Sequence, residues 1–175
     1  MKHILSLLLV TVLMLSGCAL SSQATEPVTF YYLRQHTQEE EYHLFFSEGA
    51  IGAEEREVTG YRNDLDYLLA LYMRGPVDSS LRFPFPVGSK IIGTHLEDRK
   101  LTVAMNAISS RFNEMDVTVS CACIAKTCME LADVTEVIVE SQTPDGQVLF
   151  SRSFTNDNLI LTETSTLPSE SETTQ

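Results

Sequence analysis

The 175-residue sequence contains no tryptophan, only four cysteines, and 12 basic residues against 24 acidic ones. A chain with a formal net charge of −12 repels nucleic-acid phosphates, which argues against a nucleic-acid partner. Four cysteines are too few for a small scaffold held together by disulfides. With 43% apolar residues, the chain can bury the core of one domain, which excludes a collagen-like or wholly disordered protein.

The sequence also lacks the motifs of several enzyme classes. It contains no Gly-x-Ser-x-Gly nucleophile turn, no glycine-rich phosphate loop and no two Cys-x-x-Cys pairs for zinc. Acidic pairs such as Glu54-Glu55 are adjacent along the chain, so nothing indicates that they converge on a cleft. Three histidines have no cysteine or histidine at ligand spacing and are expected to be exposed or half-exposed: His36, His43 and His95. We therefore assign no catalytic, cofactor-binding or metal-binding residue and expect no cofactor.

The N-terminus carries the most specific motif in the chain. A short basic head precedes an apolar run of 12 residues, Ile4 to Leu15, which is shorter than the roughly 20 residues of a spanning helix. The run ends in Leu-Ser-Gly-Cys, the pattern of a bacterial lipobox, in which Cys18 accepts a diacylglycerol thioether. The alternative is an ordinary signal peptide that happens to contain a cysteine. The motif predicts a lipoprotein signal peptide over residues 1–17 and lipidation of Cys18.

Composition then divides the mature chain into three parts. Residues 18–27 are small and polar and are expected to form a flexible tether from the lipidated cysteine. Residues 162–175 carry Ser, Thr and Glu with little to bury, which is typical of a disordered acidic tail. The folded domain is expected to span residues 28–161.

The first half of this domain is expected to contain two strands and a helix. Residues 28–33 and 44–47 are rich in β-branched or aromatic residues and predict strands, with a loose stretch around Gly49 and Gly52 after the second. Asn63 is placed to cap a helix whose apolar face repeats at i, i+3, i+4 and i+7 from Leu65 to Tyr72. Gly75 and Pro76 are expected to end it.

The second half predicts a hairpin, a long helix and two further strands. Residues 90–96 and 100–106 flank a turn at 97–99, and the two prolines before them exclude a central strand over 81–88. Apolar residues repeat at 4, 3, 4 and 3 between Val117 and Leu131, which predicts a helix over residues 114–131, although residues 117–121 also alternate as in a strand. Strands are expected over 134–141 and 147–154. The order β-β-α-β-β-α-β-β predicts a two-layer α+β fold with a mixed sheet and two helices.

Cys121, Cys123 and Cys128 fall in the long helix. On a helix Cys121 and Cys128 rise about 10 Å apart, beyond the span of a disulfide, so both are expected to be buried core thiols without a partner. If the segment were not helical, a bridge between Cys123 and Cys128 would become possible.

Five short segments, taken in order and spacing, give the chain a resemblance to a known family. They are residues 30–32 (FYY), 68–76 (LLALYMRGP), 85–92 (FPVGSKII), 101–106 (LTVAMN) and 127–137, which contains TCMEL and VTEV. Together they resemble a GerMN domain, the sporulation and spore-germination domain of bacterial envelope proteins. The chain departs from the family at Asn106–Ser109, where an aspartate and a serine are usual, and in carrying cysteines where the second helix usually has leucines.

The resemblance implies a fold like that of the ring-building modules of secretion and sporulation machines, and a role in envelope assembly or protein binding rather than catalysis. The expected protein is therefore a non-enzymatic lipoprotein on the outer face of the bacterial cell membrane, which binds an envelope protein or itself. Two other functions stay open: a lipoprotein that binds a small ligand or peptidoglycan, and a hydrolase that acts on the cell wall.

Overall fold

The computed structural model describes residues 25–35, 50–106, 108 and 114–159. Within them the order is β1 (Thr25–Arg34), β2 (Ile51–Thr59), α2 (Leu65–Tyr72), β3 (Leu81–Arg82), β4 (Ile91–Glu97), β5 (Lys100–Asn106), α3 (Glu114–Leu131), β6 (Glu136–Gln142) and β7 (Val148–Thr155). The α+β class with two helices is thereby confirmed for this part of the chain. The strands form two sheets: β2-β1-β3 and β4-β5-β6-β7.

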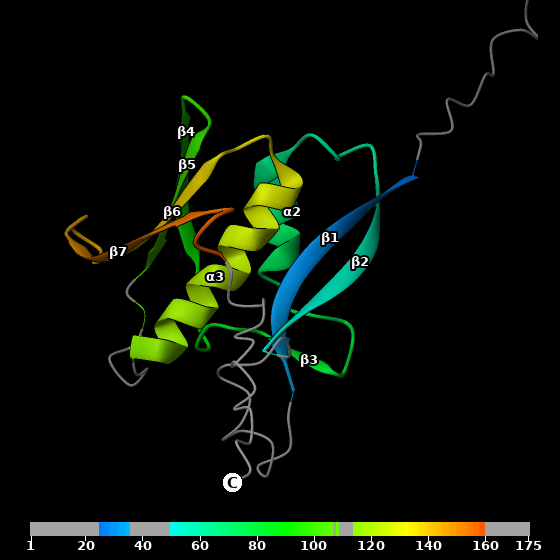
Figure 1. Ribbon diagram of the computed structural model, residues 1–175, viewed down its shortest axis with the longest axis horizontal. Helices are drawn as coiled ribbons and strands as arrows, with labels where there is room; N and C mark the ends of the chain where they lie inside the picture. The colour runs from blue at the N-terminus through cyan, green and yellow to red at the C-terminus, as the bar shows by residue number, and fades with distance from the viewer. Residues whose placement is uncertain (1–24, 36–49, 107, 109–113, 160–175) are drawn as a thin grey trace, which may run out of the picture.

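Helix α3 lies between the two sheets (Figure 1) and packs against β1 of one sheet and against β6 and β7 of the other. In the four-stranded sheet, β5 and β6 are parallel and the other pairs are antiparallel, so this sheet is mixed, as expected. Since α3 connects β5 to β6, it also serves as the crossover that parallel strands require.

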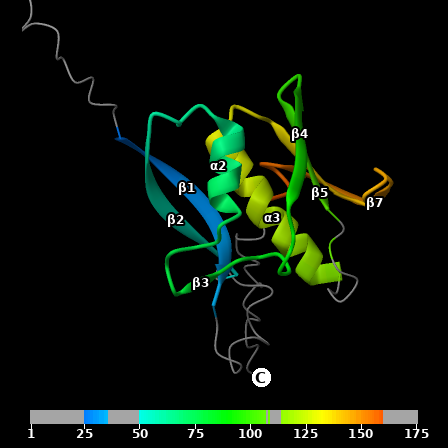
Figure 2. The ribbon, with the colours of Figure 1, turned by 180° about the vertical axis from the view of Figure 1, so that it is seen from behind.

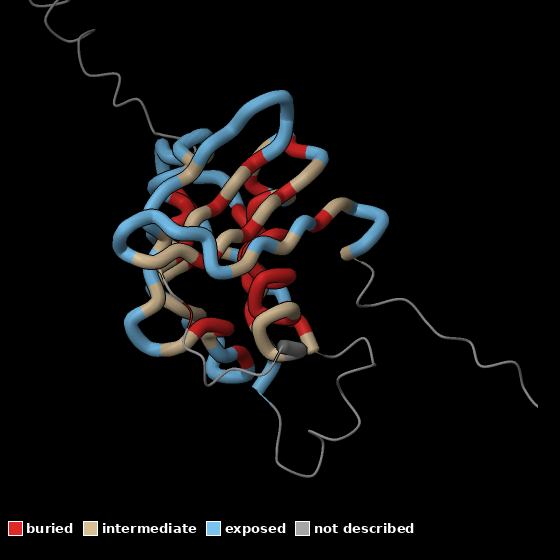
Figure 3. Tube along the Cα trace, turned by 90° about the vertical axis from the view of Figure 1, so that its left-hand side faces the viewer, coloured by how far each residue is buried: buried red, intermediate tan, exposed pale blue. Residues whose placement is uncertain are grey.

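The core gathers around α3, where Figure 3 shows buried segments in the interior and exposed ones at the loops. Alternate residues of the neighbouring strands face this core, among them Phe30 and Tyr32 of β1 and Val103 and Met105 of β5. In α3 the buried residues are not confined to one stripe, because every residue from Val119 to Ala125 is buried. A helix enclosed between two sheets buries most of its circumference, which explains its many small residues.

The long helix has the predicted boundaries, and the hairpin differs from the prediction by one residue, since β4 spans Ile91–Glu97 rather than 90–96. Helix α3 spans Glu114–Leu131, and β4 and β5 join through Asp98 and Arg99, which both have positive φ. Gly75 also has a positive φ, of 86°, as its predicted role at the end of α2 requires. The cap at the other end is Asp64 rather than Asn63, and its side chain accepts a hydrogen bond from the Tyr67 backbone N–H.

Three expectations in the first half need correction or lie outside the described residues. The stretch that contains Gly52 is strand β2, not a loose segment, because the Leu81 side chain of β3 occupies the space that a Cβ on Gly52 would need. Strand β1 begins at Thr25, so residues 25–27 pair with β2 instead of belonging to the tether. The strand expected over residues 44–47 and the tail over 162–175 lie outside the described residues.

Candidate functional site

Helix α2 and strand β4 lie side by side in Figure 2, and residues of both line a groove. Two hollows, of about 780 and 550 Å³, share Asp66 of α2 and Thr94 of β4 as lining residues. The Thr94 hydroxyl donates a 3.0 Å hydrogen bond to the Asp66 carboxylate and so bridges the two walls. The groove therefore runs along the whole of α2, with β4 as its second wall.

The groove exists because part of the inner face of β4 is not covered by other elements among the described residues. Leu96 of β4 lies opposite Leu101 of β5, so both side chains are on the same face of the sheet. Leu101 is fully buried, whereas Leu96 is 56% exposed. Ile92, at a β-bulge near the other end of β4, is 52% exposed. The inner face of an edge strand is thus left open, with apolar side chains along it.

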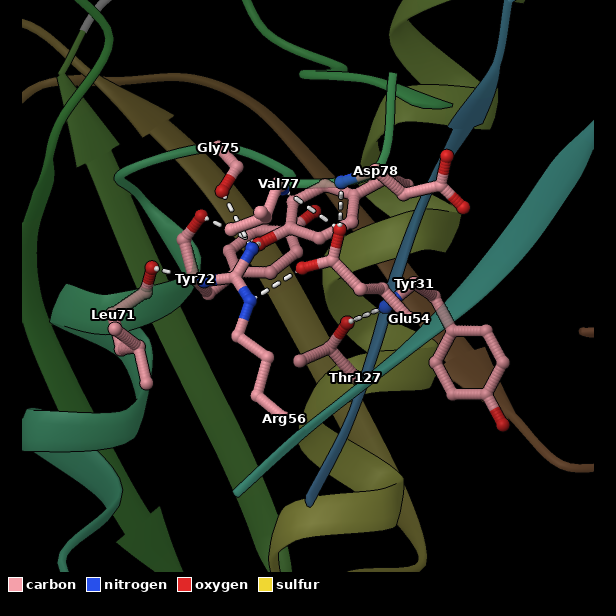
Figure 4. A network of polar contacts seen from close by, with 10 residues as sticks. Tyr31, Glu54, Arg56, Leu71, Tyr72, Gly75, Val77, Asp78 and Thr127 are labelled. Atoms are coloured by element: carbon pink, nitrogen blue, oxygen red, sulfur yellow. Dashed lines mark hydrogen bonds and ion pairs between the residues drawn. The ribbon is translucent and has the colours of Figure 1, made fainter. Parts of the chain in front are cut away.

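A buried polar network positions the C-terminal end of α2 (Figure 4). The Arg56 guanidinium of β2 donates to the backbone carbonyls of Leu71 and Gly75, and it forms an ion pair with the buried Glu54 carboxylate. Glu54 in turn accepts hydrogen bonds of 2.8 and 2.7 Å from the backbone N–H groups of Val77 and Asp78. A cation at a helix C-terminus also complements the helix dipole. The ion pair between Glu54 and Arg56 of β2 therefore holds both the C-terminal end of α2 and the loop that follows it.

An aromatic cluster packs around the same guanidinium. Arg56 lies 5.0 Å from the centre of the Phe30 ring, and it donates a 3.2 Å hydrogen bond to the Tyr32 hydroxyl. The Tyr32 and Tyr72 rings stack with their centres 4.8 Å apart, and the Tyr32 hydroxyl donates to the Tyr72 carbonyl. Burial raises the pKa of both tyrosines, so both hydroxyls stay protonated at neutral pH. The cluster fixes α2 against β1, and with it one wall of the groove.

The N-terminal end of the groove has a different character. Tyr61 and Tyr67 stack with ring centres 4.4 Å apart, and both side chains are exposed. Tyr61 lines the first hollow together with the acidic residues Glu26, Asp64 and Asp66. This end therefore combines an exposed aromatic pair with negative charge.

The residues that the sequence singled out do not come together at this groove. His36 and His43 lie outside the described residues; His95 lies exposed on β4, 3.6 Å from the Glu97 carboxylate, as expected of a surface histidine. Cys18, the lipidation residue, lies outside the described part of the chain. Cys121, Cys123 and Cys128 are buried and free, as expected for Cys121 and Cys128, and the alternative bridge between Cys123 and Cys128 is not formed.

The buried thiols predict a reactivity pattern. Burial raises the pKa of Cys121 and Cys128 to about 12, and it raises that of Cys123 as well, so the reactive thiolate is scarce. For the Cys18→Ser protein, titration with a thiol reagent at pH 8 should find no fast-reacting thiol in the native state and three after denaturation. A single free thiol in the denatured protein would contradict the unpaired state.

Sequence reasoning missed both the groove and the network that positions its wall. The pair Glu54-Glu55 was interpreted only as adjacent charges, yet Glu54 is buried and Glu55 is exposed, because they lie on opposite faces of β2. Glu54, Arg56 and Val58 occupy alternate positions of β2, and this alternation is the pattern in the sequence that indicates a strand with Glu54 and Arg56 on its buried face. Nothing local in the sequence shows that β4 would remain uncovered.

The fold and groove define a small α+β domain with an open edge strand beside a helix. No protein-family model matches the chain, and no curated protein matches its sequence. Among solved structures it is similar to the tandem GerMN domains of the sporulation protein GerM from Bacillus subtilis, with 19% identity and a TM-score of 0.49. That match covers 79% of this chain and 48% of the other, so the chain spans about half of that protein.

A second similar structure is a candidate lipoprotein from Clostridium perfringens, with 13% identity, a TM-score of 0.43, and coverage of 77% of this chain and 89% of the other. Both structures are similar to this chain at low sequence identity, and the first contains the domain that the sequence resembles. No helix in the described part of the chain is long and apolar enough to cross a membrane. No group of three or more His, Cys, Asp or Glu among the described residues is arranged to hold a metal ion.

Proposed function

We propose that this chain is a non-enzymatic, lipid-anchored protein of the bacterial cell envelope whose domain binds another protein through the groove between α2 and β4. The observation that carries this proposal is the open inner face of β4, where Leu96 stays largely exposed opposite the fully buried Leu101. An edge strand with unpaired backbone groups and exposed apolar side chains is a common contact surface for another chain.

The lipobox supports the anchor. Two acyl chains on Cys18 would hold the protein stably, since each buried CH₂ contributes about 0.8 kcal/mol. An acidic chain gains no attraction from anionic lipid, so the lipid alone must hold it. Because β1 begins at Thr25, six residues separate it from Cys18, and they reach at most about 20 Å when extended. The groove would then work close to the outer face of the membrane.

The Cys18→Ser substitution tests the anchor. We expect it to abolish incorporation of labelled palmitate and to move the protein from the membrane to the soluble fraction or to leave it as uncleaved precursor, because the thioether cannot form. Fractionation of cells with immunoblotting measures this. A Ser22→Ala variant within the same segment is the matched control and should stay in the membrane. Cleaved Cys18→Ser protein that remained membrane-bound would refute the lipid anchor.

A second candidate function is saccharide binding, which the exposed Tyr61–Tyr67 pair favours. Sugar rings stack on exposed aromatic faces, and the adjoining hollow is lined by carboxylates that can accept hydrogen bonds from hydroxyl groups. Co-sedimentation with purified peptidoglycan separates the two functions. Saccharide binding requires that Tyr61→Ala reduces sedimentation, whereas Leu96→Glu, at the strand edge, should reduce protein binding.

A link to sporulation or germination is the finer hypothesis that the GerMN resemblance of the sequence implies. Deletion of the gene followed by counts of heat-resistant spores, with complementation by the wild type and by Cys18→Ser, tests this link in a spore-forming host. Unchanged spore counts and germination would refute it and would leave the protein-binding proposal to be tested at the groove.

A further inference from the structure

We propose that the occupant of the groove is an extended, basic segment of a partner protein, which adds to β4 as an antiparallel strand with its N-terminal, basic end beside Glu26, Asp64 and Asp66. This inference rests on the proposed function and specifies the chemistry of the partner. Three features of the groove carry it: the free backbone of β4, the apolar side chains beside that backbone, and the uneven distribution of charge along the groove.

The first feature is the free backbone edge. Among the described residues, strand β4 ends its sheet and pairs only with β5. In a hairpin with a two-residue turn, the flanking residues Glu97 and Lys100 form the hydrogen-bonded pair. Pairing then alternates, so that Thr94 and Leu96 direct their backbone N–H and C=O groups away from β5. These groups are the ones that an added strand would pair with.

The bulge limits how long the added strand can be. The register shifts between Ile91 and Gly93, so the regular part of β4 runs from Gly93 to Glu97. Bulges disturb pairing, which confines a partner to about five residues on this edge.

Strand β2, at the edge of the other sheet, differs from β4 in the charge that it exposes. It displays exposed Glu55 and Glu57, and charges of this kind on an edge strand discourage strand addition. The residues of β4 between Gly93 and Leu96 carry no carboxylate or ammonium group.

The second feature is the apolar lining. Side chains of an added strand that point into the groove would meet Leu96 near one end and Ile92 and Met73 near the other. Leu96 and Ile92 are each about half exposed, so covering them removes apolar surface from water. Alternate positions of the partner should therefore be apolar, as on a strand with one buried face.

The third feature is charge. Glu26 and Asp64 line only the hollow beside Leu96, Lys90 lines only the hollow at the start of β4, and Asp66 lies between the two and lines both. Among the described residues, Arg62 is the one cation that lines the first hollow, and its guanidinium donates a 3.2 Å hydrogen bond to the Leu131 carbonyl. A partner with positive charge at the end beside Glu26 complements this distribution. Because antiparallel pairing is the more stable kind, that end is the N-terminal end of the partner segment.

Synthetic peptides test the inference on the full-length protein in detergent. The probe has two lysines followed by six alternating threonines and valines. Its reversed sequence has the same charge and composition, and a third peptide carries N-methyl groups on alternate amides. Fluorescence anisotropy at low salt should show the probe binding at least tenfold more tightly than either control peptide, because orientation and free amides both matter.

Two pairs of variants locate the binding. Leu96→Lys should weaken binding of the probe at least tenfold, because it removes an apolar contact and adds positive charge beside the probe's lysines, whereas Val148→Lys, at a similarly exposed position on the opposite edge of the sheet, should not. Glu26→Lys should weaken binding, whereas Glu55→Lys, which makes the same charge change on the outer face of β2, should have less effect. All four substituted side chains are exposed, so we expect each variant to fold, and circular dichroism of each variant checks its folding.

Equal binding of the probe and its reversed sequence would overturn the antiparallel, basic assignment. A photocrosslinking amino acid at position 96 distinguishes this failure from failure of the proposed function. A crosslink in cells to a different protein, together with no peptide preference, would preserve the interaction role and refute the basic strand. A crosslink only to a second copy, with a concentration-dependent dimer that Leu96→Glu abolishes, would overturn the inference in favour of self-association.

Discussion

Replacing Arg56 by methionine is expected to lower the free energy of unfolding by about 3–5 kcal/mol. The substitution leaves the buried Glu54 carboxylate without its cation, and it removes the donors to the Leu71 and Gly75 carbonyls at the end of α2. Methionine keeps much of the aliphatic stem, so the loss reports on the charge and the hydrogen bonds rather than on packing. Denaturant unfolding followed by circular dichroism measures it.

Two comparisons make this result specific. Lys100→Met breaks an ion pair of 2.8 Å with Glu136 in which the lysine is half exposed, and it should cost less than about 1 kcal/mol. Adding Glu54→Gln to Arg56→Met should recover part of the loss, because a neutral amide can still accept from Val77 and Asp78 without burying a charge. A loss for Arg56→Met as small as that for Lys100→Met would show that the network does not brace α2.

The elements that could be predicted from the sequence are those whose signals are local. Helix α3 and the hairpin from Ile91 to Asn106 have the predicted positions because periodicity and turn residues specify them without reference to distant parts of the chain. Gly75 ends α2 as expected for the same reason. Short-range patterns therefore gave the fold class and most of the order of elements.

Strand β2 and the groove could not be predicted because long-range packing decides them. Gly52 reads as a loop residue, yet it lies in a strand because the Leu81 side chain, 29 positions later, packs against it. Glu54 reads as one of two adjacent charges, yet N–H groups of the loop after α2 and the Arg56 guanidinium allow it to be buried. Leu96 and Leu101 are both apolar residues of the predicted hairpin, and nothing local distinguishes the exposed Leu96 from the buried Leu101.

The division of the strands into two sheets also changes the interpretation of the cysteines. A single mixed sheet would place Cys121 and Cys128 against it and leave Cys123 toward solvent. Enclosure of α3 between two sheets buries all three completely. Cys123→Ser should nevertheless be mild, because a serine hydroxyl in a helix can donate to the carbonyl four residues earlier.

Cys128→Asp is expected to be severely destabilising, by roughly 2–7 kcal/mol, which is the cost of moving a polar group out of water into an apolar interior. Cys128 is fully buried in α3, and desolvation already raises the pKa of its thiol to about 12. Among the described residues near it, Tyr72 has a buried hydroxyl without a hydrogen-bond partner; this hydroxyl can donate to a carboxylate, but it is neutral and does not balance the charge. Thermal and urea unfolding at pH 7 measure the loss.

The pH dependence of Cys128→Asp identifies burial as the cause. Desolvation would raise the pKa of the introduced carboxyl above its unfolded value of about 3.9, so its folded form prefers the neutral state. The deficit relative to the wild type should be smallest below pH 3.9 and should grow as the pH rises through the higher, folded pKa. Glu130→Asp, at an exposed position of the same helix, supplies the helix-propensity cost of aspartate, well under 1 kcal/mol, with no such pH dependence. A deficit for Cys128→Asp that did not change with pH, or that matched Glu130→Asp, would show that position 128 is open to solvent and that α3 is not enclosed between the two sheets.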